Sequence, residues 1–129
     1  MTQGIVMRAA HFPGRAPIDA YGDGGFRFAG MSHRGSLICL PSGIHGWDPA
    51  DPSNLSVGDF ERLMAQAEAV EILLVGMGTE LRPLPKPLRE AFRNARIAAD
   101  PMSTGAAVRT FNVLLAEERA VAAVLIAVD

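Results

Sequence analysis

The most regular pattern of hydrophobic positions lies in the second half of the chain, where apolar runs of strand length alternate with amphipathic stretches of helix length. The runs at 72–75, 97–99 and 121–128 are continuous, as expected for strands in a sheet that is covered on both faces. Between them, apolar residues at three- and four-residue spacing predict helices over 84–95 and 104–115. This β-α-β-α-β order is typical of a layered α/β core.

A further helix is predicted to begin after Ser56. Ser56 and Asp59 have the spacing of a capping box, with Asp in place of the usual Glu. One helical stripe then collects Val57, Phe60, Leu63, Met64 and Ala67. For the following helix, Pro85 and Pro87 stand at the first positions, where a missing N–H costs little.

The first half of the chain has a different texture, rich in glycine, proline and short apolar runs. Residues 18–21 and 26–28 flank the Gly/Asp connection 22–25, which is a hairpin signal. A buried strand is predicted over 36–40, and a further short strand over 44–47. We therefore predict a single domain over 1–129, with a β-rich part (1–55) and an α/β part (56–129).

Composition narrows the class of protein. The chain has 129 residues, 49% of them hydrophobic, and a formal net charge of -2, so we expect a globular protein with no general attraction to nucleic acid. The single cysteine, Cys39, excludes an internal disulfide. Residues 1–8 lack the apolar segment of a signal peptide, and the longest apolar run, 120–128, is too short for a membrane span of about 20 residues. These features predict a soluble, cytoplasmic protein.

Glycines follow the strand at 72–75. Gly76, Gly78 and Thr79 belong to a loop whose backbone N–H groups are candidates for binding an anion. The loop matches neither common phosphate-binding motif, and a tight exit from a central strand is the simpler interpretation. Asp100 follows another strand and is a second candidate, although an acid before proline is more often a turn or cap residue.

The third predicted helix carries two further candidates for the same cleft. Arg109 and Asn112 are three residues apart and so are neighbours on one side of the helix. Asn112 borders the apolar stripe, where a buried amide needs a partner. The structural alternative, which we favour, has Asn112 bonded to loop backbone and Arg109 paired with an acidic residue.

Metal and nucleophile chemistry have little support in the sequence. The three histidines, His11, His33 and His45, show no ligand spacing, so no metal is expected. Cys39 lies in the middle of an apolar run, where a thiol is usually inert. No cofactor and no catalytic residues are predicted.

One charged pattern stands out. Basic residues recur at spacings of four, three, four and three, which places them on one helical stripe: Arg82, Lys86, Arg89, Arg93 and Arg96. Such a stripe is most often a solvated face, but it also suits an acidic protein surface or anionic lipid headgroups. No aromatic residues interleave with it, which argues against single-stranded nucleic acid.

From Leu73 onward the chain resembles a known family. The resemblance is carried by 73–79, by Leu84-Pro85 with Leu88-Arg89, and by 102–117 with its run Ala107-Val108-Arg109-Thr110-Phe111-Asn112. The family is a small domain of unknown biochemical activity that includes the mitochondrial respiratory complex I (NADH dehydrogenase) assembly factor 3-like proteins and the adipogenesis-associated domain-containing protein. Because nothing resembles a mitochondrial transit peptide, we expect a bacterial member of the family rather than an organellar one.

The resemblance implies a three-layer α/β domain with a mixed, mainly parallel central sheet and an accessory N-terminal β layer. It implies no catalytic residues, and the chain departs from the family by having Phe111 and Val108 where Tyr and Cys are common. The leading hypothesis is a non-enzymatic protein that binds another protein in the assembly or insertion of a membrane complex. The alternative is a small-molecule- or anion-binding protein, or an enzyme, with its site at the glycine loop. The oligomeric state is left open.

Overall fold

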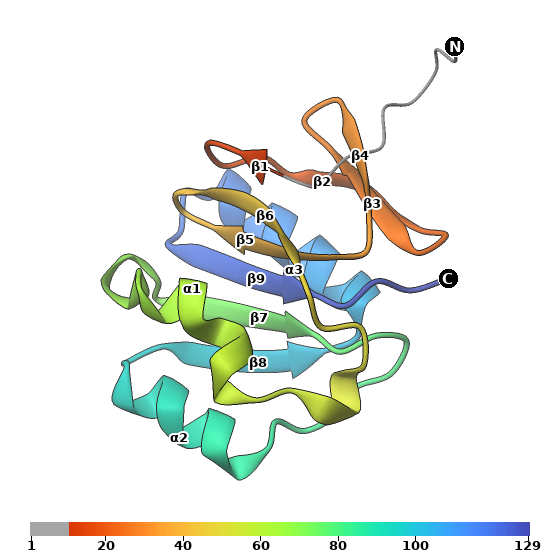
Figure 1. Cartoon of the computed structure of the whole chain (residues 1–129). Coiled ribbons are helices and arrows are strands. Elements are labelled where there is room, and N and C mark those ends of the chain that lie inside the picture. Colours follow the sequence, from red (N-terminus) through yellow and green to blue (C-terminus); the bar gives the residue numbers. More distant parts are fainter. Residues whose placement is uncertain (1–10) are drawn as a thin grey trace.

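A six-stranded sheet forms the centre of the computed structural model, which describes residues 11–129 (Figure 1). In spatial order its strands are β1 (His11–Phe12), β6 (Gly43–Trp47), β5 (Ser36–Leu40), β9 (Val121–Leu125), β7 (Ile72–Gly76) and β8 (Ala98–Met102). The predicted mixed sheet is confirmed. Strands β9, β7 and β8 are parallel, whereas β5, β6 and β1 extend the sheet with antiparallel pairings.

Helices cover both faces of this sheet. On one face lie α1 (Glu61–Met64) and α2 (Lys86–Asn94), and on the other lies α3 (Thr104–Ala116) (Figure 1). The alternation of side chains along β9 separates two cores: Ala122 and Val124 belong to the core with α1 and α2, whereas Ala123 and Leu125 belong to the core with α3. All five residues of β9 are buried, which explains why its sequence is continuously apolar.

The accessory β layer is a three-stranded sheet of β2 (Ile18–Gly22), β3 (Gly25–Phe28) and β4 (Met31–Arg34). The predicted hairpin joins β2 and β3. Its two loop residues, Asp23 and Gly24, both have positive φ, at 51° and 78°, as a tight hairpin turn requires. Phe26 and Phe28 pack from this layer into the core beside α3, which completes the three-layer fold.

The predicted continuous helix after Ser56 is wrong. The segment instead forms a 3-10 turn η2 (Val57–Phe60), the single turn α1 and a second 3-10 turn η3 (Ala67–Ala69). The capping interaction forms nevertheless, because the Asp59 carboxylate accepts the Ser56 backbone N–H at 2.8 Å. The indole N–H of Trp47, at the end of β6, donates to the Asp59 carbonyl at 2.8 Å. A side chain from a distant strand therefore occupies a carbonyl in the turn where the α-helix was predicted to begin.

Helix α2 ends earlier than predicted, and the reason is a specific C-terminal motif. The N–H of Ile97 donates to the Phe92 carbonyl at 2.9 Å and that of Arg96 to the Arg93 carbonyl at 3.0 Å. This pair of bonds defines a Schellman motif, with Arg96 in the left-handed conformation at φ 61°. Ile97 therefore closes the helix, and β8 begins one residue later than predicted, at Ala98.

The sequence led to two expectations about membranes: that the chain has no membrane-spanning segment and that it has no signal peptide. In residues 11–129, none of the helices is long and apolar enough to cross a membrane. The expectation about a signal peptide concerns residues 1–8, which lie outside the described residues.

Candidate functional site

The glycine loop leaves β7 and turns at once against α3. The N–H of Met77 donates to the Met102 carbonyl at 2.8 Å, and the N–H of Gly78 donates to the Thr104 hydroxyl at 3.0 Å. Gly78 has φ 97°, a conformation that favours glycine. Two of the N–H groups predicted to bind an anion are therefore already engaged within the protein.

Thr104 connects the ends of three elements, a role that the sequence did not reveal. Its side chain is fully buried; the hydroxyl accepts from Gly78 and donates to the Ile126 carbonyl at 2.7 Å. The Thr104 N–H in turn donates to the Gly78 carbonyl at 2.8 Å. Ser103 is the helix cap, since its side chain accepts from the Ala106 N–H at 3.3 Å. The start of α3 is thus fastened to the loop after β7 and to the end of β9.

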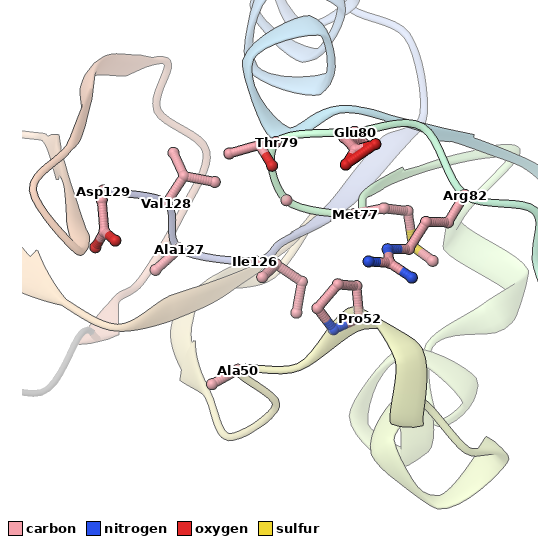
Figure 2. Close-up of a pocket in the computed structure, with 11 residues that line it drawn as sticks. Ala50, Pro52, Met77, Thr79, Glu80, Arg82, Ile126, Ala127, Val128 and Asp129 are labelled. Atoms are coloured by element: carbon pink, nitrogen blue, oxygen red, sulfur yellow. The ribbon is translucent and has the colours of Figure 1, made fainter.

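A hollow of about 270 Å³ lies at this edge of the sheet, where β7 and β9 both end (Figure 2). Gly78 and Thr79 line it, with Ala50 and Pro52 from the loop after β6 and Ile126 to Asp129 from the end of the chain. Its charged residues have mixed sign: Glu80, Asp129 and Arg82, whose guanidinium reaches toward Pro52 in Figure 2. Nearby, hydrogen bonds from Ser53, together with the charge of Arg82, lower the pKa of Asp51.

The other predicted cleft residues do not line this hollow. Asp100 is exposed on the edge strand β8, opposite Leu74 of β7, and Arg109 is exposed on α3. They form no ion pair: within residues 11–129 the ion pair that does form joins Arg119 and Glu71, at 3.0 Å. The glycine loop, Asp100, Arg109 and Asn112 are therefore not gathered around one pocket.

Asn112 follows the structural alternative. Its side-chain oxygen accepts the Ile18 N–H and its amide donates to the Ile18 carbonyl, both at 2.9 Å. Ala107, Val108 and Phe111 of the same run are buried in the core beside α3. Packing and this paired contact to β2 explain the distinctive residues of the run, except the exposed Arg109 and the half-buried Thr110.

The basic residues of the second helix occupy its solvent side. Lys86, Arg89 and Arg93 fall within about 60° of the helix circumference at 3.6 residues per turn, and we call these three residues the α2 basic face. The stripe is shorter than predicted, because Arg82 lies in the loop before α2 and Arg96 beyond its end. All five side chains are exposed, and none has a carboxylate within 4 Å in the described part of the chain.

A groove of about 420 Å³ borders the α2 basic face, and no pattern in the sequence pointed to it directly. It lies between α2 and the edge strand β8, lined by Pro83, Leu84, Arg89, Phe92, Arg93, Ile97, Ala99 and Pro101. Apolar side chains thus form most of the lining, and the two arginines supply its charge. The guanidinium of Arg89 donates to the Leu84 carbonyl at 2.6 Å, which fixes its position beside the groove.

Two histidines that are far apart in the sequence meet in the antiparallel pairing of β1 with β6. His11 and His45 are direct partners, with their Nδ1 atoms 3.5 Å apart, and an Arg62 nitrogen lies 3.4 Å from His45 Nδ1. Partial burial, then the charges of Arg62 and His11, lower the pKa of His45. Only the strand register could have revealed this pair. The described residues contain no group of three or more His, Cys, Asp or Glu able to hold a metal ion.

Comparison with known sequences gives a consistent family. The model of a family described as a protein of unknown function (DUF498/DUF598) matches residues 18–126. An uncharacterized protein of Rhodobacter capsulatus is 41% identical over 119 residues, which are 92% of this chain and 90% of that protein. NADH dehydrogenase [ubiquinone] 1 alpha subcomplex assembly factor 3 of Xenopus tropicalis is 28% identical over 109 residues, 84% of this chain but 60% of that protein.

Solved structures share the fold. A Bartonella henselae protein, described as an outer membrane protein, is 61% identical with a TM-score of 0.89 over 92% of this chain and all of its own. The Rpa2829 protein of Rhodopseudomonas palustris is 47% identical with a TM-score of 0.81, over 92% of this chain and 87% of its own. A Mth938-like domain of Bordetella pertussis, 23% identical with a TM-score of 0.76 over 86% and 85%, shows the fold alone. The resemblance inferred from the sequence is confirmed, and the chain belongs to the DUF498/DUF598 family of proteins of unknown function.

Proposed function

We propose that the protein is not an enzyme and acts by binding another protein during the assembly or insertion of a membrane complex. The relative in Xenopus tropicalis is described as an assembly factor of NADH dehydrogenase, which supports this class of function. We place the protein in the cytoplasm, because its single cysteine is buried and unpaired and so is compatible with a reducing compartment.

The observation that carries the proposal is the α2 basic face. Three exposed cations share one side of α2, and none is neutralised by a carboxylate within 4 Å in the described residues. A charge cluster of this kind steers an acidic partner and fixes its register. Leu81, in the loop before α2, is 68% exposed, so an apolar contact is available near these charges.

At the glycine loop, no observation favours the small-molecule alternative. Two N–H groups of the glycine loop bond to Met102 and Thr104, and the neighbouring hollow mixes Glu80 and Asp129 with Arg82. This is a poor match for an anion, because the two carboxylates oppose its charge.

Quantitative affinity capture from the native host tests the protein-binding role. We expect a specific partner that is recovered with the parent chain and lost with Lys86→Glu/Arg93→Glu, which reverses two charges and leaves the Arg89–Leu84 bond in place. Arg27→Glu, an exposed charge reversal on β3, is the matched control and retains the partner. Thermal unfolding of each variant establishes that it is folded. Recovery of no specific partner, or undiminished capture by the double variant, contradicts the proposal.

A further inference from the structure

The groove between α2 and β8 has an apolar floor that the fold leaves open. Phe92, Leu84 and Ile97 form its deepest part and are at most 4% exposed, while Ala99 and Pro101 form the wall on β8. Its volume of about 420 Å³ lies within the range of about 300–1,000 Å³ that is usual for ligand pockets.

The backbone of β8 limits how a partner can attach at this edge. The Ala98 N–H donates to the Glu71 carbonyl at 3.0 Å and the Met102 carbonyl accepts from Met77 at 2.8 Å, so residues 98, 100 and 102 direct their backbone groups toward β7. The backbone groups of Ala99 and Pro101 therefore point away from β7, toward the open edge of the sheet, and proline has no N–H to donate. Addition of a strand along β8 would find one donor, so recognition must depend on side chains that enter the groove.

Both charged residues that line the groove are positive. Arg89 and Arg93 line it, and Arg89 is held in place by its bond to the Leu84 carbonyl. Lys86 lies on the same side of α2. A ligand that fills the apolar floor and approaches these side chains is favoured when it carries carboxylates, since a guanidinium binds a carboxylate through two parallel hydrogen bonds.

We propose that this groove receives an acidic segment of a protein partner, which inserts one bulky apolar side chain between α2 and β8 and places carboxylates against Arg89 and Arg93. The inference rests on the proposed protein-binding function and adds the binding site and the chemistry of the partner. The chain's own first ten residues do not fit this description, because Arg8 is their only charged side chain. A bilayer fits less well than a peptide, because the apolar surface here is recessed between two elements.

Site-specific photo-crosslinking in the native host tests this assignment. A photoreactive phenylalanine analogue replaces Pro83, which lines the groove and is exposed, or Arg27 on β3 as the control position. Mass spectrometry then identifies the captured peptide. We expect the Pro83 position alone to capture a partner segment that has a large apolar residue with Asp or Glu within a few positions. A captured segment without acidic residues overturns the proposal.

A groove-filling pair separates this inference from the proposed function. Ala99→Phe places a ring in the groove, whereas Ala98→Phe places the same ring on the exposed residue beside it, with its side chain toward the opposite face of the sheet. We expect Ala99→Phe to lower capture about tenfold or more, as loss of a central anchor does, and Ala98→Phe to leave it unchanged. Circular dichroism shows that both variants are folded.

Two outcomes overturn the inference by different routes. If Lys86→Glu/Arg93→Glu abolishes capture while Ala99→Phe does not affect it, the protein-binding function stands and the groove is not its site. The second outcome comes from flotation of the protein with phosphatidylcholine vesicles that either contain or lack phosphatidylglycerol. If the parent chain binds the anionic vesicles and Ala99→Phe abolishes this binding, the groove is assigned to a membrane surface rather than to a peptide.

Discussion

Asn112 of α3 pairs with Ile18 of β2 as a neighbouring strand residue would, accepting from its N–H and donating to its carbonyl, both at 2.9 Å. A side chain thus completes the backbone bonding of the edge residue that begins the accessory sheet. The contact holds two layers of the fold in register across 94 residues of sequence.

Replacement of Asn112 by alanine should lower the free energy of unfolding by about 1–3 kcal/mol, because two backbone groups of Ile18 lose their partner. Urea denaturation measures the change. Thr110→Ala, two residues earlier on the helix, should change little and serves as the control. If Asn112→Ala is as stable as the parent but loses a partner protein or ligand, the residue belongs to a functional cleft after all.

Thr104→Val should be strongly destabilising despite its similar shape. The change removes the hydroxyl that bonds both the Gly78 N–H and the Ile126 carbonyl, and each buried group left unpaired costs about 1–3 kcal/mol. Thr104→Ser keeps both bonds and should cost only about 1 kcal/mol for the lost methyl group. Hydrogen exchange at the Gly78 amide gives an independent readout: it should accelerate in the valine variant and not in the serine variant.

Arg96→Gly should stabilise the protein by up to about 1 kcal/mol, because Arg96 has φ 61° at the position of the Schellman motif where glycine is most favourable. The gain is limited by the greater freedom of glycine in the unfolded chain. Glu90→Gly, inside the same helix, should instead lower stability by about 0.5–1 kcal/mol. Equal losses at both positions in thermal unfolding would mean that Arg96 is not strained.

Cys39 should not react with a thiol reagent in the native protein. Its side chain is 1% exposed, and burial raises the pKa of the thiol to about 12, so the reactive thiolate is scarce at neutral pH. Stopped-flow measurement with an aromatic disulfide reagent should show labelling only at the rate of unfolding, and full labelling in urea. Rapid modification of the folded protein would reopen a redox role.

His45 should make the stability of the protein depend on pH. The pKa of His45 is lowered in the folded protein, so around pH 6 the unfolded chain binds more protons than the native state. The contribution of His45 is therefore fully present above its unfolded pKa of about 6.5 and decreases as the pH falls through the folded pKa. Urea denaturation at several pH values should show a shallower dependence for His45→Gln. By NMR titration, Arg62→Ala should raise the pKa of His45.

The elements that the sequence predicted best are those whose environment is uniform along their length. Strands β7 and β9 are buried on both faces, so their apolar runs needed no knowledge of their neighbours. The segment after Ser56 shows the limit of this reasoning. Phe60 and Leu63 are buried at helical spacing, as the stripe required. However, the Trp47 indole bonds to the Asp59 carbonyl before the helix, and the chain returns to 3-10 turns after a single α-helical turn.

The candidate sites depended on contacts that sequence spacing does not contain. The Thr104 hydroxyl is defined by partners from two other segments, and the two histidines by the register of β1 with β6. The groove arises because an edge strand lies beside α2, and strand order is not readable from periodicity. The α2 basic face was predictable, since exposed charge at helical spacing needs no partner to be recognised, whereas Arg82 and Arg96 lie outside the helix.

The position of β9 in the sheet has a consequence for how the protein folds while it is being synthesised. This strand lies between β5, from the first part of the chain, and β7, yet it is the last strand in the sequence. On the ribosome, the β1–β6 portion and the β7–β8 portion are synthesised before the strand that joins them exists. Neither portion completes its side of the two cores until residues 121–125 have left the exit tunnel, so the nascent chain must keep two apolar sheet edges from pairing with other molecules until β9 has emerged.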